Sequence, residues 1–173
     1  MGWLYRKEIK GQRIKEALTN YITWGGAPDI EIMRSQVGGR VAYIAIRNLA
    51  TGEIGAIVVL IHHDKRGGEI GFKVISEGEG PYYYGCPDRI LKILTPTEDP
   101  GALEWRSRCR AYNEKIARLR GDLTGKRINL WGATYTIEGR SYNRGRSWQG
   151  RHLGSGVLYT IRPSQLKKAD LLD

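Results

Sequence analysis

The chain lacks any apolar run long enough to cross a membrane. Its longest, IGAIVVLI at residues 54–61, is far shorter than the ~20 residues that a membrane-spanning helix needs. The N-terminal segment MGWLYRKEIK has no apolar centre of the secretory type, and Arg6 stands where an N-myristoylation motif has Ser or Thr. We therefore expect a cytoplasmic protein that neither spans nor is anchored to a membrane.

Cysteine is scarce, and the common cofactor motifs are missing. The 173 residues include only Cys86 and Cys109, and without an export signal we expect two reduced thiols. No GxGxxG or P-loop spacing occurs, so the sequence predicts no cofactor. By residue type, His62, His63 and the two cysteines could bind zinc. Neighbouring histidines on a strand point to opposite faces, however, and we expect no metal site.

Acidic residues are sparse at one end of the chain. Residues 1–105 carry 13 basic and 13 acidic residues, whereas residues 106–173 carry 15 basic and 5 acidic ones. The whole net charge of +10 therefore arises in the C-terminal part. Such a segment attracts polyanions, although a basic face can also be merely solvated.

Hydrophobic periodicity predicts an α+β fold. Residues 11–23 have apolar side chains at helical spacing. Three or four strand-like runs separated by glycine-containing turns follow: IEIMRSQV, RVAYIAIRN, IGAIVVLIHH and GEIGFKVIS. We expect an antiparallel β-meander with the first helix packed on one face.

Two helices and a β-rich tail are expected next. PDRILKILT predicts a short helix that starts at Pro87, and residues 100–121 predict a longer one that ends at Gly121. The apolar side of the longer helix is expected to comprise Leu103, Trp105, Cys109, Tyr112, Ile116 and Leu119. The basic residues of this helix are expected to point largely away from the apolar side. They are Arg106, Arg108, Arg110, Lys115, Arg118 and Arg120.

The tail predicts a second module. KRINLWGATYTIEG, RSWQGRHLG and GVLYTIRPSQL are three strand-like runs with glycine-rich breaks. A module of this size suits a small SH3-like barrel that rests on the helices. We therefore expect an α+β domain over residues 1–121 and a basic β-rich module, packed on it, over 122–173.

The block EIGFKVISEGEGPYYYGCPDRILKILTPTEDPGALEWRSRCRAY, residues 69–112, resembles a family of proteins carried by phages, plasmids and other mobile elements. The matching positions are Gly80, Pro81, Tyr82, Tyr83, Cys86, Pro87, Leu91, Trp105, Arg106 and Cys109. The family typically has an MGW-type start and a basic β-rich tail. Gly85 replaces the acidic residue usual before the cysteine. The resemblance implies a role in phage or plasmid biology, such as regulation or counter-defence, but no established activity.

The GPYYYGCP stretch has two interpretations. Cys86 directly precedes a helix start, a position that can lower the pKa of a thiol and make it nucleophilic. A small thiol among aromatic residues is more often a packing residue. We expect no catalytic residue, with an enzyme that uses Cys86 as an alternative.

The stretch GRSYNRGRSWQGRH, residues 139–152, has four arginines, two aromatic residues and no acid. Arginines bind phosphates and aromatic rings stack on bases, so it predicts a nucleic-acid surface. The expected binding residues are Lys126, Arg127, Arg140, Tyr142, Arg144, Arg146, Trp148 and Arg151. Alternatively, Trp148 and Tyr142 belong to a core. The same residue types also serve protein interfaces, so an acidic host protein such as a nuclease, or a nucleoprotein, is an alternative partner.

Overall fold

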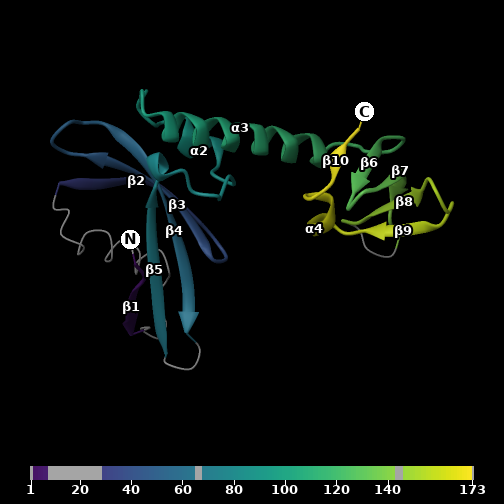
Figure 1. The fold of residues 1–173 in the computed structure, drawn as a ribbon, viewed down its shortest axis with the longest axis horizontal. Helices are drawn as coiled ribbons and strands as arrows, with labels where there is room; N and C mark the ends of the chain where they lie inside the picture. The colour runs from purple at the N-terminus through teal and green to yellow at the C-terminus, as the bar shows by residue number, and fades with distance from the viewer. Residues whose placement is uncertain (1, 8–28, 65–67, 143–145, 173) are drawn as a thin grey trace. The chain divides into compact units, whose positions relative to one another are not determined.

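The computed structural model describes residues 2–7, 29–64, 68–142 and 146–172. These residues form an α+β structure with two five-stranded antiparallel sheets and few helices (Figure 1). The chain divides into two compact units, Met1–Asn113 and Glu114–Asp173, here called the N-terminal and C-terminal units. This division lies upstream of the boundary expected after Gly121. The helix predicted over residues 11–23 lies outside the described residues.

The sheet of the N-terminal unit has the strand order β1-β5-β4-β3-β2. Its strands are β1 (Leu4–Lys7), β2 (Ile30–Gly38), β3 (Val41–Asn48), β4 (Ile54–Asp64) and β5 (Glu69–Ser76). The last four form the expected meander. Strand β1 was not expected, and it extends the sheet by pairing with β5.

Alternation along the central strands gives this sheet two apolar faces. On β3, Ala42 and Ile44 belong to one buried cluster, while Ala45 and the partly buried Tyr43 belong to another. Because successive side chains on a strand point to opposite faces, the two clusters lie on opposite sides of the sheet. The second cluster also contains buried residues from the helices and from the segment that leads into them, namely Cys86, Ile90, Leu91, Trp105 and Cys109. The helices therefore cover this second face.

The helical segments are the 3-10 turn η1 (Glu77–Glu79) and the helices α2 (Asp88–Leu91) and α3 (Pro100–Arg120). Asp99 caps α3, because its Oδ1 accepts the N–H of Ala102 at 2.8 Å. The helix ends before Gly121, as the sequence predicts. Helix α2 is shorter than the segment predicted.

The buried side of α3 differs from the expected one. Ala102, Trp105, Arg106 and Cys109 are all buried. Their spacing of i, i+3, i+4 and i+7 places them on one stripe of the helix. Arg106 therefore belongs to the buried stripe and not to the charged side, whereas the expected core residues Leu103 and Tyr112 are exposed.

The sheet of the C-terminal unit has the order β10-β6-β7-β8-β9. Its elements are β6 (Arg127–Leu130), β7 (Ala133–Arg140), β8 (Trp148–His152), β9 (Leu158–Ile161), helix α4 (Pro163–Leu166) and β10 (Asp170–Leu171). The first predicted run of this tail is two strands joined by the turn Trp131–Gly132. The third run contains a strand and a short helix. After α4 the chain returns to pair β10 with β6.

The C-terminal unit has its own core. Its largest buried side chain is Trp148, and aliphatic residues of the strands and of α4 surround it. Leu119, near the end of α3, also belongs to this cluster. Among the described residues, no helix is both long and apolar enough to cross a membrane.

Candidate functional site

The block of residues 69–112, which resembles the mobile-element family, contains residues whose roles in the N-terminal unit are structural. The indole N–H of Trp105 donates to the carbonyl of Tyr83 at 3.1 Å, and the N–H of Gly85 donates to the hydroxyl of Tyr43 at 3.0 Å. Gly80 adopts a left-handed conformation with φ 63°, which favours glycine. These contacts fix the segment that leads into α2 on the sheet and on α3.

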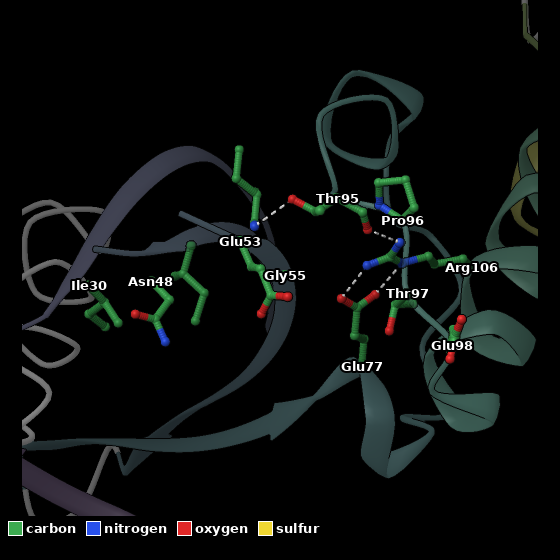
Figure 2. A pocket seen from close by; sticks show the side chains of 12 residues that line it. Ile30, Asn48, Glu53, Gly55, Glu77, Thr95, Pro96, Thr97, Glu98 and Arg106 are labelled. Carbon is green, nitrogen blue, oxygen red and sulfur yellow. Dashed lines mark hydrogen bonds and ion pairs between the residues drawn. The ribbon is translucent and has the colours of Figure 1, made fainter. Parts of the chain in front are cut away.

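Arg106 and Glu77 form a buried ion pair in the lining of a pocket of about 600 Å³ (Figure 2). The Arg106 Nε and Nη2 donate to the two carboxylate oxygens of Glu77 at 2.7 and 2.8 Å. Arg106 Nη1 donates to the carbonyl of Thr95 at 2.6 Å, and Glu77 accepts the N–H of Ala56 at 2.9 Å. Because both charged groups are engaged with each other and with backbone, the pair ties α3 and η1 to β4.

The two cysteines do not have the properties of catalytic nucleophiles. Cys86 and Cys109 are free, and both are fully buried. Burial raises the pKa of the Cys86 thiol well above its usual range, and burial likewise raises the pKa of Cys109 to about 12. A protonated thiol without access to solvent cannot attack a substrate. The geometry therefore favours the packing interpretation of Cys86.

The described residues also hold no group of three or more His, Cys, Asp or Glu side chains placed to bind a metal ion. Instead, His62 lies in an aromatic cluster with Trp3 and Tyr5, with ring centres 5.9 and 6.2 Å away. Cys86 and Cys109 lie in the core under the helices. The structure therefore does not bring the four possible zinc ligands together.

The basic stretch of residues 139–152 is divided between the core and the surface. Trp148 is 2% exposed, so its ring is not an open stacking surface, whereas Tyr142 is 98% exposed. Arg140 and Arg146 are exposed. Arg144 lies outside the described residues.

Arg151 is exposed, but its charge is neutralised. Its Nε and Nη2 donate to the carboxylate of Glu138 at 2.5 and 3.1 Å, and its Nη1 donates to the carbonyl of Gly156 at 2.8 Å. This arrangement explains why the pKa of Glu138 lies below its usual value, mainly through the hydrogen bond from Arg151. Arg151 is therefore paired with Glu138 in this structure, and it does not line the pocket described next. Lys126 and Arg127, at the start of β6, are exposed and do not line the pocket described next.

A pocket of about 370 Å³ in the C-terminal unit gathers basic and apolar side chains. Its basic residues are Arg120, Arg140, Arg146 and Lys167. Its apolar lining comprises Ile116, Leu119, Trp148, Pro163 and Leu166. None of the four cations forms an ion pair with a described carboxylate, and the lining contains no acidic residue among those described. We call this site the basic pocket.

Arg140 is held against the core at this site. It lies directly opposite Trp148 across β7 and β8, and its guanidinium carbon lies 3.9 Å from the centre of the indole ring. This distance is well within the range of a cation–π contact. The side chain is nevertheless exposed and lines the pocket, so this charge is both positioned and accessible.

A β-bulge produces this pairing. The register of β7 against β8 shifts between Ile137 and Gly139. The extra residue places Arg140, and not Gly139, opposite Trp148. Strand alternation alone does not reveal the shift, so the basic stretch in the sequence does not show which of its arginines meets the tryptophan.

Two pocket cations lie outside the stretch that the sequence singled out. Arg120 is the last residue of α3, and Lys167 follows α4. The excess of charge in residues 106–173 includes both, but their sequence separation hides their proximity to Arg140 and Arg146. The signal that could have found them is a lysine or arginine at the C-terminal end of each helix that supplies apolar residues to this core.

One acidic group lies close to the basic pocket without lining it. The pKa of Asp122 is lowered, chiefly by the N–H of Thr124, next by the hydroxyl of Thr124 and to a smaller extent by the charge of Arg140. The Asp122 carboxylate accepts from that N–H at 2.9 Å and from that hydroxyl at 2.7 Å. Asp122 therefore stays negatively charged near Arg140, although the two form no ion pair among those of the described residues.

Comparisons with protein-family models, curated proteins and solved structures found no match to this chain. The resemblance to proteins of phages and plasmids therefore stays a prediction.

Proposed function

We propose that this protein binds nucleic acid, free or within a nucleoprotein, through the basic pocket and the surface around it. The observation that carries the proposal is the convergence of Arg120, Arg140, Arg146 and Lys167 on one pocket without a carboxylate partner among the described residues. Cations gathered in one pocket repel one another, and a bound polyanion relieves that repulsion. The arginine guanidinium matches the geometry of phosphate groups and can donate two hydrogen bonds to one of them.

The surrounding surface supports the same ligand. The exposed cation Lys126 of the C-terminal unit has no described ion-pair partner and would add to the field felt by an approaching strand. Tyr142 offers an exposed ring for contact with bases.

The strand order, with a short helix before the strand that returns to β6, is also consistent with the SH3-like barrel expected from the sequence.

The resemblance to proteins of mobile elements suggests where this activity would be used. A small basic protein of a phage or plasmid can act on nucleic acid in the cytosol of its host, in regulation or in counter-defence. In this proposal the protein works by binding, and the buried thiols of the N-terminal unit serve its stability.

A second function, the binding of a host protein, rests on a different surface. Strand β9 lies at one end of the sheet and pairs only with β8 among the described strands. The exposed apolar side chains on and beside it are Leu153, Val157, Leu158 and Tyr159. An apolar strand at a sheet edge is a common site for a partner's strand.

A binding measurement separates the two functions. Fluorescence anisotropy of labelled DNA and RNA, titrated with the full chain at low salt, should show binding that weakens steeply as salt rises. The absence of binding to both nucleic acids at low salt would overturn the proposal and favour the protein partner.

A further inference from the structure

We propose that the basic pocket accepts one nucleotide of a single strand, with its base against Arg140 and its phosphate between the other cations. This inference rests on the proposed function and specifies the form of nucleic acid. It follows from three properties of the pocket: its concave shape, the position of Arg140 and the mixture of charge with apolar surface.

The shape and size of the pocket fit a single nucleotide. Its volume of about 370 Å³ lies in the range of small-ligand sites. The backbone of a duplex is convex, and its bases are stacked inside, so a duplex can touch the rim of such a pocket but cannot fill it. An unpaired nucleotide can turn its base away from the strand and enter.

Arg140 supplies a flat surface on which that base can stack. One side of its guanidinium lies over the ring of Trp148, which is itself fixed in the core. The other side faces the pocket, because Arg140 is exposed and lines it. Bases stack on arginine guanidinium planes as well as on aromatic rings. The contact with Trp148 positions this surface before the ligand arrives, which lowers the entropic cost of binding.

The remaining lining residues match the other parts of a nucleotide. Arg120, Arg146 and Lys167 provide the positive charge for a phosphate, and arginine can donate two hydrogen bonds to it. Leu119, Leu166 and the other apolar residues can contact the faces and edges of a base or sugar. A peptide carboxylate would use the charges but leave the stacking surface of Arg140 unused. This combination therefore favours a nucleotide over an acidic peptide.

The test compares a strand with its duplex. The probes are a fluorescent 12-nucleotide single-stranded DNA that carries one 2-aminopurine, and the same strand annealed to its complement. We expect the full chain to bind the single strand at least about tenfold more tightly than the duplex, since stacking of one base contributes a factor of this size. The 2-aminopurine fluorescence should change on binding.

Arg140→Lys is the decisive variant, because it keeps the charge and removes the planar stacking surface. We expect its affinity for the single strand to fall about tenfold and its affinity for the duplex to stay the same. The matched control, Arg118→Lys, changes an exposed arginine outside the pocket and should alter neither affinity. Thermal unfolding of each variant shows whether it is folded under the assay conditions. If Arg140→Lys is unfolded, Arg140→Gln replaces it; because this change also removes the charge, both affinities should fall, and the loss for the single strand should exceed the loss for the duplex by about tenfold.

Two results would overturn the inference and leave the proposed function standing. One is equal affinity for strand and duplex, and the other is a folded Arg140→Lys variant that binds the single strand as the wild type does. A failure of both probes to bind at low salt would instead overturn the proposed function itself.

Discussion

The guanidinium of Arg140 lies over the indole of Trp148, and the two residues are direct partners across β7 and β8. One of them is exposed and charged, and the other is among the largest side chains of the core. The pair thus connects the stability of the C-terminal unit with the position of a charge in the basic pocket. Substitutions of the two residues should have different consequences.

Trp148→Ala should destabilise the C-terminal unit by about 3 to 5 kcal/mol, because it leaves a large cavity in the core. Urea-induced unfolding followed by circular dichroism measures the change. Tyr142→Ala removes an exposed aromatic ring from the same stretch and should change the free energy of unfolding by no more than about 0.5 kcal/mol. Equal effects of the two substitutions would show that Trp148 is not a core residue.

Arg106→Met should destabilise the protein by about 3 to 5 kcal/mol, because it leaves the buried carboxylate of Glu77 without its partner. The double variant Arg106→Met, Glu77→Met should lose less than the sum of the two single losses. Arg108→Met on the same helix removes an exposed partner of Glu104 and should cost at most about 1 kcal/mol. A loss for Arg106→Met as small as that for Arg108→Met would contradict the structural role of the buried pair.

Cys86 and Cys109 should react slowly with iodoacetamide in the native protein, even at pH 9. Their pKa values are raised by burial, so the thiolate fraction stays small in the folded state at a pH where an exposed cysteine is largely ionised. Mass spectrometry of labelled protein should show fast modification only after denaturation. Rapid labelling of Cys86 in the folded state would restore the enzyme alternative.

Trp131→Asn should raise the free energy of unfolding by about 1 kcal/mol. Trp131 has φ 56° in a two-residue hairpin turn and is 69% exposed, so its side chain gains little burial in a backbone conformation that asparagine adopts more easily. Thermal unfolding measures the gain. Gly132→Ala, at φ 81° in the same turn, should have the opposite effect. A loss of stability in Trp131→Asn would mean that the indole makes contacts that outweigh the strain.

The sequence predicted the elements with strong periodicity and short connections. The four meander strands and the end of α3 at Gly121 followed from alternation and from glycine in the turns. Strand β1 was missed because its few residues carry no alternating pattern of their own, and it is stabilised by pairing with β5. The prediction that Arg106 points away from the core was wrong. It followed from the residue type, since arginines are usually exposed, whereas the helical spacing from Ala102, Trp105 and Cys109 places Arg106 on the buried stripe.

The sequence also predicted that the candidate site is basic, but it did not predict which residues form the site. The charge excess and the arginine-rich stretch pointed to the C-terminal unit. The choice between Arg140, which lines the pocket, and Arg151, which pairs with Glu138, depends on a bulge and on a cross-strand neighbour. Arg120 and Lys167 come to the pocket from the ends of two different helices. Such long-range pairings are set by packing, which local sequence does not encode.

The most direct test of the central claim is the salt dependence of single-strand binding in two matched double variants. Arg120→Gln, Lys167→Gln removes two charges from the basic pocket, and Arg118→Gln, Lys168→Gln removes the same two charge types from exposed positions that do not line it. If the pocket holds phosphate, the pocket variant should bind more weakly, and the slope of log K against log salt should shrink in magnitude by up to about 0.7, the value for one phosphate that is no longer neutralised. The control variant should keep the wild-type slope. An equal loss of affinity and slope in both variants would contradict a specific site. It would mean that binding depends only on the overall charge of the C-terminal unit.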